Sequence, residues 1–290
     1  MAGALDFIGP YQILRMIRSG NTTTVFEAMP TGGGSDRVAL KVLLDRFKKD
    51  RSKIEELRHE ANVGKNLNHD NVITIYEFSN QYSLPFISMQ LFNARNLKQE
   101  LREKPERLGA RLEEIIVYCA EGLRHLHSQG WIHCDVKPDN FLVDENANVK
   151  LIDFSIARKT KTGLAAFFSR NRVLQGTRSY MAPEQIRRKQ VTPATDIYGF
   201  GCVIFELLTG KPPFTGVSPD EVLNKHLRAP LPSIQASNRT VSDNFSHLLS
   251  QMLAKNPDKR PKSVDSFLTA FKALNNRIYR AGMRPTYTEN

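Results

Sequence analysis

The stretch Ile132-His133-Cys134-Asp135-Val136-Lys137-Pro138-Asp139-Asn140-Phe141-Leu142, followed by Asp153-Phe154-Ser155, decides the fold. Short apolar runs at 141–143 and 149–152 lie between the polar groups, a pattern typical of a small β-hairpin with polar side chains at its ends. Carboxylates and amides are ligands of hard cations that bridge phosphates, whereas soft metals need thiolate or imidazole. If this segment binds a hard cation, His133 and Cys134 are therefore poor candidates for its ligands.

These two motifs resemble the catalytic loop HRDLKPEN and the metal-binding DFG of eukaryotic-type protein kinases. The resemblance implies that Asp135 orients the substrate hydroxyl and accepts its proton, while Lys137 steadies the γ-phosphate of ATP. It also implies that Asn140 and Asp153 hold Mg²⁺, with Mn²⁺ as a possible substitute. By the same resemblance, His133 is a packed histidine that hydrogen-bonds to backbone.

Upstream, Val38-Ala39-Leu40-Lys41 resembles the kinase VAIK motif, which places Lys41 on a strand facing the α- and β-phosphates. A lysine inside an apolar strand is costly unless another group pairs with it. The partner is expected on a helix predicted at 52–66. Glu60 matches the family's glutamate by its spacing before residues 67–72, and Glu55 and Glu56 are the alternatives.

The resemblance also predicts an ATP pocket. Met89 would guard the back of the adenine site, the backbone of Gln90 and Phe92 would meet the adenine edge, and Asn96 would reach the ribose. Apolar side chains would enclose the ring. The complete set of predicted nucleotide-binding residues is Ile17, Gly20, Val25, Ala39, Lys41, Met89, Gln90, Phe92, Asn96 and Leu142.

Gly176-Thr177-Arg178-Ser179-Tyr180-Met181-Ala182-Pro183-Glu184 resembles the end of a kinase activation segment, a platform for protein substrates. Thr177 matches the threonine that lines the substrate-hydroxyl site, and together with Lys137 it indicates Ser or Thr rather than Tyr as the acceptor. In the family, the glutamate at position 184 pairs with a late arginine, here Arg260. Asp196 matches the start of the buried central helix.

The fold class predicted from these patterns is α+β, a protein-kinase-like bilobal fold with a small antiparallel β lobe and a larger, mainly helical lobe. Strands are expected at 11–17, 24–29, 38–43, 72–78 and 85–89, with a hairpin turn at 32–34. Later helices are expected at 112–129, 195–209, 219–227, 242–254 and 263–275. The predicted boundaries are 1–88 for the N-terminal lobe, 89–96 for the hinge, 97–277 for the C-terminal lobe and 278–290 for a polar tail.

Composition limits the function classes. The 290 residues are 40% hydrophobic, which is ordinary for a globular protein, and no apolar run approaches the roughly 20 residues of a membrane span. Three cysteines without a CxxC pair indicate reduced thiols, so the expected location is cytoplasmic, or the cytosolic domain of a longer protein. The formal charge of +11 is dispersed, so a solvated surface is favoured, no nucleic acid is expected, and an acidic protein partner remains compatible. The sequence does not indicate an oligomeric state.

The sequence departs from the kinase pattern at the glycine-rich loop. The segment 17–25, here called the lid, keeps Gly20 but has Arg18 and Thr23 at the other two glycine positions. Glycines let backbone amides approach phosphates closely, so this lid is expected to be weaker or stiffer than usual.

Two further departures are Cys134, in place of the arginine before the catalytic aspartate, and Ser155, in place of the glycine of DFG. Loss of the arginine indicates activity that does not depend on a phosphorylated activation segment, although Thr160, Thr162 and Ser169 are modifiable. Serine at 155 is expected to restrict the backbone rearrangements of the segment that begins at Asp153, which glycine would ease.

The expected activity is transfer of the γ-phosphoryl group of ATP to Ser or Thr hydroxyls of protein substrates. None of the three departures removes a predicted metal ligand, the base or the phosphate-binding lysine. One alternative is a pseudokinase that binds nucleotide or acts as a scaffold without turnover. Another is a small-molecule kinase of similar fold, which the protein-substrate platform disfavours.

Overall fold

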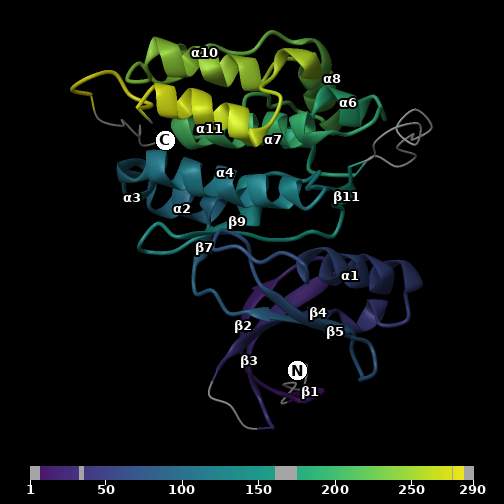
Figure 1. Ribbon diagram of the computed structural model, residues 1–290. Helices are drawn as coiled ribbons and strands as arrows, with labels where there is room; N and C mark the ends of the chain where they lie inside the picture. The colour runs from purple at the N-terminus through teal and green to yellow at the C-terminus, as the bar shows by residue number, and fades with distance from the viewer. Residues whose placement is uncertain (1–6, 33–35, 161–174, 276, 284–290) are drawn as a thin grey trace. The chain divides into compact units, whose positions relative to one another are not determined.

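A computed structural model describes residues 7–32, 36–160, 175–275 and 277–283. The chain divides into two compact units (Figure 1). The β-rich unit comprises Met1–Asn93 and Ile152–Ile156, and the helical unit comprises Ala94–Leu151 and Ala157–Asn290. The Asp153-Phe154-Ser155 motif thus belongs to the β-rich unit, whereas the motif at 132–142 belongs to the helical unit.

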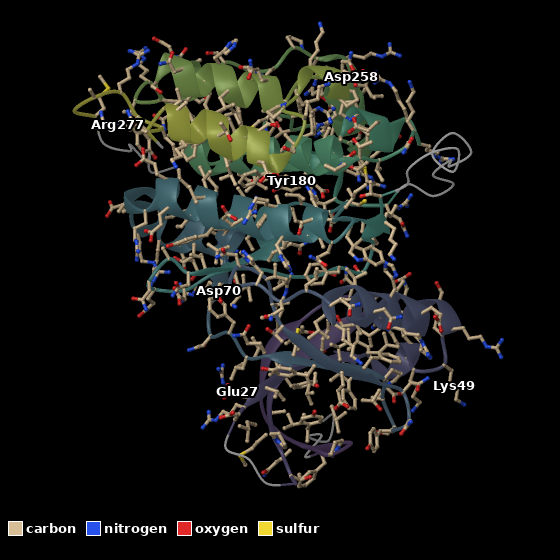
Figure 2. The ribbon with its side chains drawn as sticks, in the orientation of Figure 1. Glu27, Lys49, Asp70, Tyr180, Asp258 and Arg277 are labelled. Carbon is tan, nitrogen blue, oxygen red and sulfur yellow. The ribbon has the colours of Figure 1, made fainter. Side chains whose placement is uncertain are left out.

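The β-rich unit is built on one antiparallel sheet, with six strands in its described part, in the order β1-β2-β3-β4-β6-β5. The strands are β1 (Phe7–Ile8), β2 (Tyr11–Ser19), β3 (Thr23–Pro30), β4 (Val38–Leu43), β5 (Ile75–Ser79) and β6 (Phe86–Gln90). Strands β3 and β4 pair antiparallel, so the predicted hairpin at 32–34 joins neighbouring strands, although residues 33–35 lie outside the described ranges. Figure 2 labels Glu27 of β3, a buried carboxylate that pairs with Arg15 and Arg37.

Strand β4 shows why this sheet can hold a charged group. Val38, Leu40 and Val42 belong to a hydrophobic core cluster. Side chains alternate between the two faces of a strand, so Ala39 and Lys41 lie on the opposite face. Lys41 is therefore presented away from the core that stabilises its strand.

One long helix, α1 (Arg51–Gly64), accompanies the sheet and packs against β4, β5 and β6. It begins at Asp50, whose carboxylate accepts from the backbone N–H groups of Ser52 and Lys53 and so caps the first turn. At its end, a Cβ on Gly64 would lie 2.4 Å from Ile75 Cδ1, so only glycine allows the helix to approach β5 this closely.

The helical unit contains α2 (Leu97–Glu103), α3 (Pro105–Ala110), α4 (Leu112–Ser128), α6 (Pro183–Ile186), α7 (Pro193–Thr209), α8 (Pro219–Arg228), α9 (Ile234–Ser237), α10 (Asp243–Met252) and α11 (Val264–Ala273). Its short strands are β7 (Arg95–Asn96), β8 (Trp131–Ile132), β9 (Phe141–Val143), β10 (Val149–Leu151) and β11 (Arg158–Lys159). Strands β10, β9 and β7 form one small sheet, and β11 pairs with β8. Single 3₁₀ turns lie at Asp45–Phe47 of the β-rich unit and at Pro138–Asn140, Arg178–Tyr180 and Pro257–Lys259 of the helical unit.

Helix α7 forms the centre of the helical unit. Every residue from Thr195 to Leu208 is buried, as expected for a helix that is apolar on all sides. Helices α4 and α10 pack against α7, and α11 packs against α4 and α10 (Figure 1). The helix ends at Gly210, whose φ of 79° is the left-handed conformation that favours glycine.

The chain after α11 remains part of the packed unit. Ile278 is fully buried and its backbone N–H donates to Glu113 Oε1, while Tyr279 forms a β-bridge with Val241. The prediction of a polar tail from residue 278 is corrected accordingly, because an apolar side chain at 278 fills a site in the helical core.

The α+β class, with a small antiparallel part and a larger helical part, is confirmed. The five predicted late helices are present, with ends shifted by no more than two residues. The predicted strand at 72–78 is wrong at its start, because β5 begins at Ile75. Val72 and Ile73 are buried apolar residues outside any named strand, so their apolar character reflects core packing.

Candidate active site

The β-rich unit gathers three charged side chains from three different segments. Lys41 Nζ on β4 lies 2.8 Å and 2.6 Å from the two carboxylate oxygens of Glu60 on α1. It also lies 3.4 Å from Asp153 Oδ1. We call this group the lysine cluster. Glu55 and Glu56, the alternative partners, pair instead with Arg58 and Lys53.

Burial determines the electrostatics of the lysine cluster. Burial acts to lower the pKa of Lys41, but the carboxylates of Asp153 and Glu60 outweigh it and raise that pKa above its ordinary value. For Glu60, burial raises the pKa to about 7, with Asp153 adding to the rise and Lys41 opposing it. Lys41 therefore stays charged and holds two carboxylates in a fixed geometry.

The face of the sheet that carries Lys41 also carries the apolar residues predicted to enclose adenine. In the ladder register, Val25 is directly opposite Lys41 on one side, and Met89 is opposite Ala39 on the other. Directly opposed residues share a face of the sheet. Ile17 lies in an irregularity of the β2–β3 pairing and is 43% exposed.

Hydrogen bonds to backbone carbonyl oxygens hold the lid in place, although two of the family's three glycines are absent. Gly20 N–H donates to Thr23 O at 2.9 Å, which closes the turn between β2 and β3. Leu44 N–H donates to Thr22 O, and Arg46 Nη2 donates to Asn21 O at 2.7 Å. A Cβ at Gly20 would lie 3.1 Å from Thr23 O, a tight contact that a side chain could make only if the turn shifted by a few tenths of an ångström.

The adenine prediction concerns the backbone of Gln90 and Phe92, at the end of β6 and just after it. Gln90 N–H donates to Thr74 O and is therefore occupied. Within the described ranges, the backbone of Phe92 makes no hydrogen bond. The Phe92 N–H is thus available to a ligand, and its contact with adenine stays a prediction.

The helical unit holds the second polar group, which we call the aspartate cluster. Asp135 Oδ2 lies 2.5 Å from Lys137 Nζ, and Thr177 N–H donates to Asp135 Oδ1 at 2.8 Å. Lys137 Nζ also donates to Thr177 Oγ1 at 2.9 Å. One lysine therefore connects the carboxylate to the hydroxyl of the activation-segment threonine.

Asp196, at the start of α7, fixes the backbone of this loop. Its carboxylate accepts from the N–H groups of His133 at 2.7 Å and Cys134 at 2.9 Å, and it lies 2.8 Å from His127 Nε2. Cys134 has a φ of 68°, a left-handed conformation that is uncommon for a residue with a side chain. The buried carboxylate thus stabilises a strained turn directly before Asp135.

The thiol of Cys134 is in an environment that makes it unreactive. Its side chain is buried, and burial raises the pKa of its thiol, with the charge of Asp196 adding to the effect. Its carbonyl accepts from Gln185 Nε2 at 2.8 Å. The residue that replaces the family's arginine is therefore a packed thiol rather than a nucleophile.

The two predicted metal ligands belong to different units and are described separately. Asn140 Nδ2 donates to Asp135 O at 2.8 Å, which leaves its amide oxygen without a hydrogen bond in the described chain. Asp153, with a φ of 67°, has its carboxylate beside Lys41. An amide oxygen and a carboxylate fit Mg²⁺. Among the described residues there is no cluster of three or more His, Cys, Asp or Glu suited to a metal.

Two predicted nucleotide contacts lie on the small sheet of the helical unit. Asn96 is 5% exposed, and its side chain accepts from Gln99 N–H at 2.8 Å as the N-cap of α2. The ribose assignment of Asn96 therefore competes with a capping role that already occupies its oxygen. Leu142 pairs with Asn96 and Lys150, and it is more exposed than its neighbours Phe141 and Val143.

Two ion pairs, each with a buried glutamate, fix the architecture of the helical unit. The predicted Glu184–Arg260 pair is confirmed as a bidentate contact, with distances of 2.7 Å and 2.9 Å. Glu206 on α7 pairs with Lys98 and accepts from the hydroxyl of Tyr180, which Figure 2 labels. Such pairs specify geometry more than they add stability.

Three contributors were not predicted from the sequence. Arg46 holds the lid through Asn21 O, and Gln185 holds the loop at Cys134. Asp196 was expected only as a helix start.

Of the predicted modifiable residues, Thr160 is exposed and described, whereas Thr162 and Ser169 lie outside the described ranges.

Comparison with known proteins agrees with this geometry. The protein kinase domain family matches residues 11–272, so the chain belongs to that family, and the predicted resemblance is confirmed. The chain is 32% identical over 269 residues to serine/threonine-protein kinase PrkC of Bacillus subtilis, covering 91% of this chain and 41% of PrkC. It is 33% identical over 288 residues to a probable serine/threonine-protein kinase PknB of Corynebacterium glutamicum, covering 96% of this chain and 44% of that protein.

A third relative is serine/threonine-protein kinase PknA of Mycobacterium tuberculosis, 32% identical over 283 residues, covering 96% of this chain and 63% of PknA. The chain thus spans from two-fifths to under two-thirds of the length of these curated relatives. None of the helices in the described ranges is long and apolar enough to cross a membrane.

Proposed function

We propose that this chain is an active protein kinase that transfers the γ-phosphoryl group of ATP to Ser or Thr hydroxyls of protein substrates. The observation that carries the proposal is the aspartate cluster. A carboxylate is held on one oxygen by a backbone N–H and on the other by Lys137, which also contacts Thr177. The names of the relatives support the Ser/Thr class.

In the proposed reaction, the acceptor hydroxyl attacks the γ-phosphorus while the bond to the β-phosphate breaks and ADP leaves. The hydroxyl proton passes to Asp135, whose carboxylate is already oriented by Thr177 N–H. Lys137 supplies positive charge to the transferred phosphoryl group. Because Lys137 also contacts Thr177, the hydroxyl site and the charge that stabilises the reaction are coupled.

The lysine cluster is assigned to nucleotide binding. Lys41, fixed by Glu60, would bind the α- and β-phosphates, and Val25, Ala39 and Met89 would contact adenine from their shared face of the sheet. When bound, Mg²⁺ would neutralise phosphate charge. Asn140 and Asp153 would hold it through their oxygen atoms.

The test is incubation of the full chain with Mg²⁺, γ-labelled ATP and a generic protein substrate, followed by phosphoamino acid analysis. We expect label on Ser and Thr, loss of transfer with EDTA, and no transfer by Asp135→Asn. Transfer to Tyr alone would contradict the Ser/Thr class. Absence of transfer, without thermal stabilisation by Mg²⁺ and ATP, would contradict the enzyme and favour the pseudokinase alternative.

A further inference from the structure

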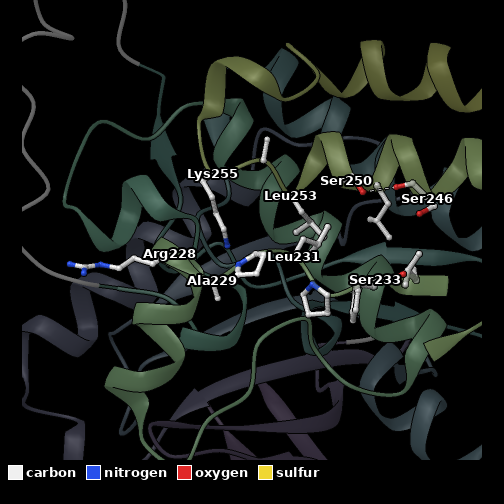
Figure 3. A pocket seen from close by; sticks show the side chains of 14 residues that line it. Arg228, Ala229, Leu231, Ser233, Ser246, Ser250, Leu253 and Lys255 are labelled. Carbon is white, nitrogen blue, oxygen red and sulfur yellow. Dashed lines mark hydrogen bonds between the residues drawn. The ribbon is translucent and has the colours of Figure 1, made fainter. Parts of the chain in front are cut away.

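The helical unit contains a pocket of about 470 Å³ that shares no residue with the aspartate cluster (Figure 3). It is formed by the end of α8, the extended segment 229–233, α10, and the chain that follows α10. Its apolar wall is formed by Pro230, Leu231 and Pro232, which are at least partly exposed, over the buried side chains of Phe205, Ile234, Leu249 and Leu253. The pocket therefore offers a surface that suits aliphatic side chains.

The two charged side chains that line this pocket are both positive. Lys255 and Arg228 both line it, together with the hydroxyls of Ser233, Ser246 and Ser250. Among the residues that the structure describes, no Asp or Glu lines the pocket. Arg228 is exposed and has no carboxylate partner in the described ranges. Within the described residues, no carboxylate thus neutralises the cations of this pocket.

The surroundings of the Lys255 ammonium are the strongest indication that this pocket binds an anion. Its ammonium lies 4.0 Å from the centre of the Phe214 ring and 3.3 Å from Lys225 O, and in the described chain it meets no carboxylate. An ammonium group has three donors, and these contacts leave capacity for another acceptor. Burial lowers the pKa of Lys255 to about 8, and the charges of Arg260 and Arg187 add to the effect. A half-buried cation among other cations is stabilised by an anion brought from outside.

Figure 3 shows Lys255 directed toward the segment that contains Ala229 and Leu231, while the Arg228 side chain extends away from the other labelled residues. Ser246 and Ser250 lie at the other end of the pocket, joined by a hydrogen bond from Ser250 Oγ to Ser246 O at 2.8 Å. The pocket thus has a cationic end, an apolar wall and a hydroxyl end. An inorganic anion alone would leave the apolar wall uncovered.

We propose that this pocket binds an acidic segment of a partner protein, with a carboxylate at Lys255 and an aliphatic side chain against Leu231 and Pro232. Charge complementarity selects the carboxylate, and the apolar wall selects the aliphatic neighbour. The site lies outside the reacting groups of the proposed kinase. A bound segment would anchor a substrate or regulator to the helical unit without touching Asp135.

The test uses fluorescence anisotropy with the full chain, in the absence of nucleotide, and three short fluorescein-labelled peptides. One peptide alternates Glu with Leu, the second replaces Glu by Gln, and the third replaces Leu by Ser. We expect the Glu–Leu peptide to bind at least about tenfold more tightly than either of the others, since each lacks one of the two contacts. Equal binding of the Gln–Leu peptide, or no binding of any peptide, would overturn the proposal.

Lys255→Met keeps the aliphatic stem and removes the charge, so it should weaken binding of the Glu–Leu peptide about tenfold. Lys272→Met, an exposed lysine on α11, is the matched control and should bind like the parent. If Lys255→Met proves unstable, Ser250→Glu should weaken binding by repulsion, with Ser250→Gln as its control. Equal affinity of Ser250→Glu and Ser250→Gln would contradict the site.

Sedimentation of the parent and Lys255→Met distinguishes a second copy of this chain as occupant. Self-association that disappears in Lys255→Met would overturn the peptide assignment, while a monomer in both supports it. Because none of these measurements involves catalysis, their outcome is independent of the phosphoryl-transfer assay.

Discussion

The lysine cluster and the aspartate cluster hold their carboxylates in different ways. In the lysine cluster, Lys41 Nζ is the charged group that holds the Glu60 carboxylate, and the Asp153 carboxylate contacts both Lys41 and the backbone N–H of Ser155. In the aspartate cluster, Asp135 is held by a lysine and by the backbone N–H of Thr177. Glu60 is thus held by a charged side chain, whereas Asp135 is held by a charged side chain and by a close backbone N–H at 2.8 Å.

The two clusters are therefore expected to respond differently to substitution and to a change in pH. A buried ion pair is vulnerable to loss of either charge and to proton binding. A carboxylate fixed partly by backbone keeps its position when a neighbouring side chain changes. Substitutions in the lysine cluster are therefore expected to affect stability together with activity, and those in the aspartate cluster mainly activity.

The largest effect is expected for Asp135→Asn. Asparagine keeps the shape but cannot accept the hydroxyl proton, so kcat should fall roughly 10²- to 10⁴-fold while nucleotide affinity changes little. Rate measurements with a protein substrate, together with titration of nucleotide binding, check this. Asp139→Asn, the same change four residues away, should retain activity. A comparable fall in both variants would refute a special role for Asp135.

Glu60→Gln should break the lysine cluster, with a loss in kcat/KM of roughly 10- to 100-fold, because Lys41 loses the charge that fixes it. Glu56→Gln is the control on the same helix, since its carboxylate pairs with Lys53 at the surface. Steady-state kinetics at varied ATP would reveal the loss. Equal kinetics for the two variants would show that Glu60 has no part in positioning Lys41.

The pH dependence of stability sharpens the same comparison. The folded chain raises the pKa of Glu60 from 4.5 to about 7, so between these values the unfolded chain loses its proton first. The stability of the parent relative to Glu60→Gln should therefore fall as the pH rises through this window, by at most about 3 kcal/mol. Urea unfolding of both proteins at the two ends of the window measures it. A constant difference would mean that Glu60 titrates normally.

Thr177 tests the coupling within the aspartate cluster. Thr177→Val removes the hydroxyl that accepts from Lys137 but keeps the backbone N–H that holds Asp135. We expect kcat to fall about tenfold, the value of one hydrogen bond to a charged group. Thr177→Ser restores the hydroxyl and should stay within about threefold of the parent. A serine variant as slow as valine would indicate a packing role instead.

The smallest effect is expected for the lid. Arg46→Gln removes the contact to Asn21 O, and a freer lid should raise the KM for ATP about two- to threefold, as for an exposed charged contact. Lys48→Gln, which removes a surface pair with Asp45, is the control. An unchanged KM in Arg46→Gln would mean that the turn of β2 and β3 holds the lid alone.

The elements that the sequence predicts well are those whose signals are local and repeated. The late helices carry apolar periodicity over several turns together with Ser, Thr or Pro near their starts. Strand ends and two-residue strands such as β7 have no periodicity to detect. Asn96 illustrates an available signal that was missed, because Asn96 and Gln99 form a capping box recognisable from their spacing.

The lysine cluster could be predicted only through the family resemblance. Periodicity alone leaves Glu55, Glu56 and Glu60 open, since each helix register turns a different carboxylate toward the sheet. The anchoring roles of Asp196 and Gln185 join residues separated by more than 50 positions. Contacts over such separations depend on tertiary packing, which no local pattern records.

Asp196 holds the loop before Asp135 through two backbone N–H groups rather than through side chains. Every amino acid except proline offers the same N–H. The hydrogen bonds that position the loop before Asp135 are therefore independent of the side chain at position 134, and cysteine in place of the family's arginine leaves both of them intact.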